Sequence, residues 1–150
     1  MGTRNRFAGQ DGYRNINGAG ITFENDDRRL ANVDHPVDAR VAAAVEQAAA
    51  ACGCTININS TVREPGQEPH TSGRSVDINS VNGIPVSDPR AHALVTQIAN
   101  ALLMQPEVEQ VISPTVAVTV VRGQRVPITN RALLEQHNSH LHVGVRVRQQ

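Results

Sequence analysis

Aromatic residues are almost absent from this chain of 150 residues, which has only Phe7, Tyr13 and Phe23 and no tryptophan. Binding of sugars or nucleobases by stacking on aromatic side chains is therefore not expected. Apolar residues make up 39% of the sequence. Valine, isoleucine, leucine and alanine must consequently form the hydrophobic core.

The chain also lacks net charge, because 14 basic residues balance 14 acidic ones. Proteins that bind nucleic acids or anionic membranes usually carry a basic surface, so neither partner is expected. No stretch approaches the ~18 consecutive apolar residues of a membrane span. The first 15 residues contain neither the apolar segment nor the cleavage site of a signal peptide.

Cysteine is rare as well, since Cys52 and Cys54 are the only two. In an extended chain, two cysteines at this spacing are too close for an unstrained bridge. We expect small buried side chains at a junction between a helix and a strand, which would say nothing about the redox compartment.

Hydrophobic periodicity, capping residues and turn signals divide the rest of the chain. Residues 1–33 are polar and rich in glycine and asparagine, and are expected to form an irregular arm or covering segment. Residues 34–150 are expected to form a single domain. The patterns predict helices over 36–52, 88–105 and 130–136, and strands over 54–61, 74–87 (with a tight turn at Asn82-Gly83), 109–113, 115–129 and 140–147.

These elements predict an α+β fold, in which a mostly antiparallel sheet carries two main helices on one face. The opposite face is unusually polar, because three of its strands place asparagine, serine, aspartate or histidine there. Alternation along the last strand directs His140 and His142 to that face. Asp77 takes the equivalent side of its own strand, and His70 lies in the preceding loop. Two imidazoles and one carboxylate would form a zinc site with an open fourth position, which predicts a zinc cleft on this face.

The segment "TVREPGQEPHTSGRSVDI" and the closing "HLHV" resemble the motifs of the LAS-type zinc metallopeptidases. That family includes D-Ala-D-Ala carboxypeptidases, L-alanyl-D-glutamate endolysins, the penicillin-insensitive murein endopeptidase and hedgehog-like domains. The resemblance covers about residues 54–145. It implies that His70, Asp77 and His142 bind Zn²⁺, and that Arg63 orients the substrate or stabilises the developing oxyanion. Gly73 matches the family's turn glycine.

The sequence departs from many carboxypeptidase-type members at Ser139, where they have an acidic residue. The spacing of His137, His140 and His142 instead resembles the murein endopeptidase branch. There, two histidines that do not bind the metal take part in catalysis. The resemblance therefore implies that His137 is the general base and that His140 donates a hydrogen bond to the tetrahedral intermediate, with Glu135 as the alternative base.

The expected protein is a monomeric hydrolase that cuts a stem-peptide or cross-link bond of bacterial peptidoglycan, as an endopeptidase or a carboxypeptidase. Its substrate lies outside the cytoplasm, in the periplasm or the wall of a target cell. The expected routes there are a secretion system, phage-type lysis or membership of a longer exported protein. An antibacterial effector of this kind would have an immunity or delivery protein as a partner.

Two alternatives remain open at this stage. His70 and His137 each begin an H-x-[ST] element of the kind found in metal-independent two-histidine phosphoesterases, although that function gives Asp77, His140 and His142 no role. The second alternative is a hedgehog-like binding module that keeps zinc but has lost catalysis, which the absence of an acid at Ser139 favours.

Overall fold

A computed structural model describes residues 6–24, 36–62, 69 and 72–148. Its main sheet has eight strands in the order β2-β4-β5-β10-β7-β8-β9, with β6 paired to β5. Only β2 and β4 are parallel, whereas all other neighbours are antiparallel. The strands are β2 (Ile21–Phe23), β4 (Ile56–Ser60), β5 (Ser75–Val81), β6 (Ile84–Pro85), β7 (Val108–Ile112), β8 (Ala117–Val121), β9 (Gln124–Pro127) and β10 (Leu141–Val145).

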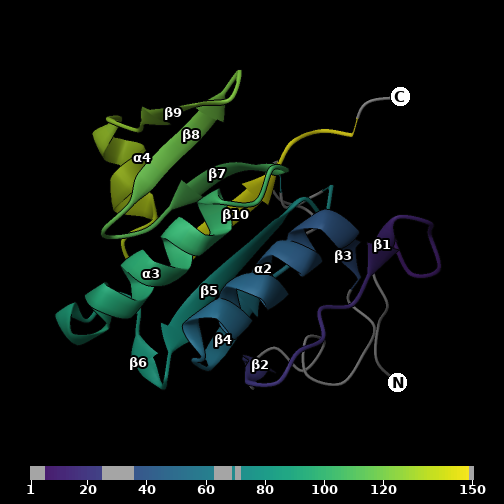
Figure 1. Cartoon of the computed structure of the whole chain (residues 1–150), viewed down its shortest axis with the longest axis horizontal. Coiled ribbons are helices and arrows are strands. Elements are labelled where there is room, and N and C mark those ends of the chain that lie inside the picture. Colours follow the sequence, from purple (N-terminus) through teal and green to yellow (C-terminus); the bar gives the residue numbers. More distant parts are fainter. Residues whose placement is uncertain (1–5, 25–35, 63–68, 70–71, 149–150) are drawn as a thin grey trace.

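Helices α2 (Ala39–Cys52) and α3 (His92–Leu103) lie side by side across one face of this sheet (Figure 1). They bury an aliphatic core against alternate residues of the central strands, among them Val76, Val111 and Val143. The predicted α+β class and the two helices on one face are confirmed. A third helix, α4 (Arg131–Gln136), follows the β8–β9 hairpin and begins at its cap Asn130.

The first helix begins three residues later than predicted. Pro36 precedes a short strand, β3 (Val37–Asp38), and Asp38 caps α2 through a bond from the backbone N–H of Arg40. The aspartate was the stronger start signal because its side chain satisfies an N–H group that otherwise has no partner in the first turn. The predicted stop at Gly53 is confirmed, since this residue has a left-handed φ of 66° and its N–H closes the helix.

Two tight turns shape the hairpins of the sheet. Asn82 and Gly83 both have positive φ, as the Asn-Gly pair predicts, and join β5 to β6. Arg122 and Gly123 do the same between β8 and β9. Turns of this type match the right-handed twist of the flanking strands.

Two short strands occur within the segment expected to be an irregular arm. The strand β1 (Tyr13–Arg14) pairs with β3, and β2 extends the main sheet beside β4. The Phe7 and Tyr13 rings stack with their centroids 4.3 Å apart. The described part of this segment is therefore built into the fold.

The two cysteines form a disulfide bond, which corrects the expectation of two separate side chains. The Cα atoms of Cys52 and Cys54 are 5.2 Å apart, within the span of about 4.4–6.8 Å that a bridge requires. The extended-chain estimate was wrong because the left-handed Gly53 turns the chain at the end of α2.

Replacing Asp38 with alanine should lower the free energy of unfolding by about 3–5 kcal/mol, the usual cost of breaking a buried ion pair. Its carboxylate is fully buried and accepts hydrogen bonds from the side chains of Arg40 and Arg148. Burial alone would raise the pKa of Asp38, but these two guanidinium groups lower it below its usual value. Urea denaturation at neutral pH would measure the loss.

The lowered pKa of Asp38 also fixes the pH dependence of that loss. The stabilisation is fully present above about pH 4, near the unfolded-state pKa, and disappears as pH falls through the lower folded-state value. The difference between wild type and Asp38→Ala should thus shrink in acid. Asp88 offers a matched control, because it caps the turn η1 (Pro89–Ala91) and pairs with Arg90 in the same way, but near the surface. Equal losses in Asp38→Ala and Asp88→Ala would contradict this account.

Candidate functional site

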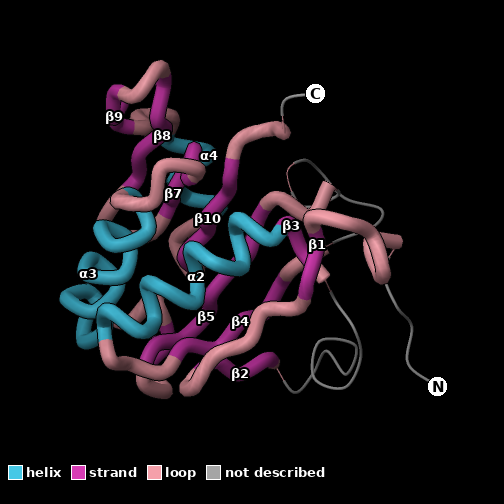
Figure 2. Tube along the Cα trace, turned by 45° about the vertical axis from the view of Figure 1, so that its right-hand side comes forward, coloured by secondary structure: helices cyan, strands magenta, loops and turns pink. Residues whose placement is uncertain are grey.

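The centre of the sheet brings Asp77 and His142 together. Strand β10 lies between β5 and β7 (Figure 2), and its register places His142 directly opposite Asp77. Leu141 and Val143 point into the helix-covered core, so His142 must face the other side of the sheet. The predicted alternation of this strand is confirmed. A histidine and an aspartate thus share the sheet face opposite α2 and α3.

Both side chains are almost completely buried, with exposed fractions of 4% for His142 and 3% for Asp77. The His142 Nδ1 atom lies 3.0 Å from Asp77 Oδ1. In a neutral imidazole, the nitrogen that faces a carboxylate carries the hydrogen, and the other nitrogen keeps its lone pair. This contact therefore orients the His142 ring toward the Asp77 carboxylate.

His140 approaches the other oxygen of the same carboxylate. It lies in the bend just before β10, and its Nε2 atom is 3.8 Å from Asp77 Oδ2. Its side chain is 18% exposed. Asp77 consequently lies between two imidazoles, one buried and one partly exposed.

His137 completes the cluster from a different element. It follows the last turn of α4, and its ring centroid is 5.0 Å from that of His140 and 5.3 Å from that of His142. Its Nδ1 atom lies 2.8 Å from the backbone oxygen of Leu133. Because a carbonyl oxygen can only accept, Nδ1 must donate, and the neutral ring presents Nε2 as a proton acceptor.

Two of the predicted site residues, His70 and Arg63, lie outside the described residues. The described residues nearest to them are linked, since the Pro69 carbonyl oxygen accepts bonds from the Ser72 hydroxyl and the Arg74 N–H. A Cβ atom placed on Gly144 would lie 3.5 Å from Pro69 and 3.7 Å from His142 Nε2. Pro69 therefore lies against β10 next to the His142 ring.

Gly73 adopts a left-handed φ of 71°, in keeping with its role as the expected turn glycine. A Cβ atom there would lie 3.2 Å from the Phe7 ring and 3.3 Å from the Tyr13 ring. The stacked aromatic pair thus covers the turn that leads from the loop into β5. Sequence reasoning missed this contact, although the position of two of the chain's three aromatic residues within its first 15 positions was a signal.

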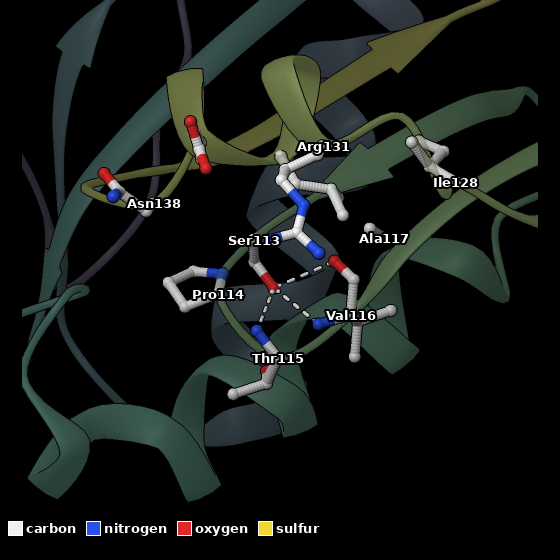
Figure 3. Close-up of a pocket in the computed structure, with 10 residues that line it drawn as sticks. Ser113, Pro114, Thr115, Val116, Ala117, Ile128, Arg131 and Asn138 are labelled. Atoms are coloured by element: carbon white, nitrogen blue, oxygen red, sulfur yellow. Dashed lines mark hydrogen bonds between the residues drawn. The ribbon is translucent and has the colours of Figure 1, made fainter.

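A cavity of about 420 Å³ lies beside the histidine cluster, between α4 and the β7–β8 turn (Figure 3). Glu135 and Asn138 line it from α4 and the following turn, and Arg131 lines it one helical turn earlier. The predicted alternative base, Glu135, is therefore placed at the cavity and not among the histidine contacts. Nothing in the sequence pattern revealed this cavity, because it depends on how α4 lies against a hairpin.

The donor atoms present fit a zinc ion in type. Imidazole nitrogen and carboxylate oxygen are preferred zinc ligands, and the His142 and Asp77 side chains already face each other. Among the described residues, which do not include His70, no set of three or more histidine, cysteine, aspartate or glutamate side chains is arranged to hold a metal ion. Asp77 and His142 would supply two ligands, and the third remains assigned to His70 by the motif.

No protein-family model matches the chain, and no curated protein matches it either. In the part of the chain that the structure describes, no helix is long and apolar enough to span a membrane. The functional assignment must consequently come from the residues and their geometry.

Proposed function

We propose that this protein is a zinc-dependent peptidase that hydrolyses a peptide bond of bacterial peptidoglycan. The observation that carries the proposal is the buried Asp77–His142 pair with His140 at its open edge and His137 in ring contact. His70, Asp77 and His142 would hold the zinc ion. When bound, zinc acts as a Lewis acid that polarises the scissile carbonyl and lowers the pKa of water.

His137 would accept the proton of the attacking water. Its Nδ1–H is already committed to the Leu133 carbonyl, so its free Nε2 has the form that a general base requires. As the new C–O bond forms, the C–N bond breaks and the proton passes to the departing amine. Glu135 remains the alternative base.

His140 would donate a hydrogen bond to the carbonyl oxygen as negative charge develops on it. It lies at the more exposed side of Asp77, where a substrate can reach it. Arg63 would orient the substrate or assist at the same oxygen, as the motif implies. Donors placed where charge develops stabilise a transition state more than a ground state.

The disulfide supports a site of action outside the cytoplasm. Bridges such as Cys52–Cys54 form and persist mainly in secreted and periplasmic proteins, because cytosolic reductants keep thiols reduced. This fits a protein that works in the periplasm or on the wall of a target cell, where an effector would meet its substrate. The proposed protein acts as a monomer.

The test is incubation of the purified protein with peptidoglycan, followed by mass spectrometry of the released peptides. We expect new peptide termini, loss of activity after treatment with a zinc chelator, and recovery when Zn²⁺ is restored. Protein without bound zinc and without cleavage in the presence of added zinc would refute the proposal.

Zinc content and a second substrate separate the two alternative functions. Zinc bound at one ion per chain with no cleavage of any peptidoglycan would indicate the binding module. Hydrolysis of a cyclic phosphodiester in the presence of chelator would indicate the two-histidine phosphoesterase.

A further inference from the structure

The cavity beside α4 has one cation and one anion in a lining that is otherwise part apolar and part polar. Arg131 and Glu135 are four residues apart on α4 and therefore lie on the same side of the helix. Both are exposed, and neither side chain forms a hydrogen bond or an ion pair with another described residue. Figure 3 shows the Arg131 side chain reaching across the cavity toward Ser113 and Val116.

The remaining wall contains both apolar and polar residues. Val116, Ala117, Ile128 and Leu134 supply apolar surface. The one buried hydroxyl, that of Ser113, donates to the Val116 carbonyl and accepts from the N–H groups of Thr115 and Val116, so it is occupied in shaping the turn. The volume of the cavity, about 420 Å³, is within the range of small-ligand sites.

Two residues that line the cavity are sequence neighbours of residues in or beside the histidine cluster. Ser113 directly follows Ile112, which is paired in register with His142, and Asn138 directly follows His137. A peptide whose scissile bond lies at the cluster could therefore place a neighbouring side chain in the cavity.

We propose that this cavity binds a zwitterionic amino-acid group, with its carboxylate on Arg131, its ammonium on Glu135 and its methylene chain on the apolar wall. Guanidinium matches a carboxylate in two parallel hydrogen bonds, which gives direction as well as affinity. The inference rests on the proposed function: in peptidoglycan, such a group ends the side chain of a diaminodicarboxylate stem residue. The cavity would thus select walls with this residue over walls with lysine, whose side chain ends in an ammonium alone.

The binding test uses three small molecules that share the same five-carbon chain between their charged groups, and binding is followed by calorimetry or by NMR shifts of the protein. They are meso-diaminopimelate, pimelate without the amino groups and 1,5-diaminopentane without the carboxylates. We expect meso-diaminopimelate to bind at least about tenfold more tightly than either of the others, since only this molecule offers partners to both Arg131 and Glu135. Equal affinities for all three would overturn the inference.

Variants locate the site. Arg131→Gln and Glu135→Gln should each weaken binding of meso-diaminopimelate about tenfold or more, whereas Arg125→Gln on the exposed strand β9 should leave it unchanged. All 14 basic residues are arginines, so a carbodiimide can join Glu135 to an amine of the ligand without competition from lysine side chains. A cross-link found at Glu135 by mass spectrometry would support the assignment, and one found only at other acidic residues would contradict it.

Kinetics distinguish this inference from the proposed function. If the cavity selects the substrate, Arg131→Gln raises KM for diaminopimelate-type peptidoglycan, leaves kcat unchanged, and does not affect a lysine-type wall. If the wild type cuts both wall types with equal KM, the inference fails while the peptidase proposal stands. If meso-diaminopimelate binds and no wall is cut, the peptidase proposal fails while the assignment of the cavity stands. A fall in kcat on both walls in Glu135→Gln would assign Glu135 to proton transfer instead of ligand binding.

Discussion

His142→Ala is expected to abolish hydrolysis of peptidoglycan peptides, with kcat/KM falling at least about a thousandfold. The substitution removes a zinc ligand, and the charge stabilisation that a catalytic metal supplies is several kcal/mol, of which about 4 kcal/mol equals a thousandfold. Bound zinc, measured by plasma mass spectrometry after native purification, should fall in parallel. Wild-type activity in His142→Ala would refute the assignment.

Stability must be separated from chemistry in this variant, because His142→Ala removes one partner of the buried Asp77 carboxylate. The double variant with Asp77→Asn removes that charge and should recover part of the lost stability without recovering zinc or activity. His92→Ala provides a histidine control at the start of α3, away from the cluster. Circular dichroism of the wild type and these three variants would show whether the fold is retained.

His137→Ala is expected to lower kcat by about 10²–10⁴, the usual contribution of a general base, while KM and bound zinc remain near their wild-type values. The reason is that His137 contributes the free Nε2 acceptor and is not assigned to the metal. Steady-state kinetics on a defined peptide would separate kcat from KM.

Chemical rescue gives this prediction a sharper readout. Alanine leaves a space beside His140 and His142, and free imidazole in the buffer should restore part of kcat in His137→Ala but not in His142→Ala. Asn138→Ala, a change in the same turn, should have little effect on kcat. Undiminished turnover by His137→Ala would transfer the role to Glu135 or to water alone.

Most of the fold could be predicted because its signals are local. The Ala-rich run, Asn82-Gly83 and the alternation along β10 each determine their own element. The start of α2 was misplaced because Pro36 and Asp38 both mark helix starts, and Asp38 provides the cap by accepting a bond from the Arg40 N–H. The bonds from Arg148 to the same carboxylate come from the other end of the chain and leave no trace in a local pattern.

The pairing of Asp77 with His142 was foreseeable since both residues occupy polar positions in alternating strands. Their exact opposition depends on the register between β5 and β10, which no local signal specifies. The ring contacts of His137 and the cavity at Arg131 depend on where α4 lies against the sheet. The Cys52–Cys54 bridge was missed because the left-handed Gly53 shortens the distance between the two cysteines relative to an extended chain.

The place of β10 in the sheet has a consequence for folding during synthesis. It is the last of the described strands in the sequence, yet it lies between β5 and β7 in the sheet. Until residues 141–145 leave the ribosome, β5 and β7 each keep one open edge, and His142 has not yet reached Asp77. A nascent chain would therefore acquire its central strand and its paired histidine and aspartate in a single late event.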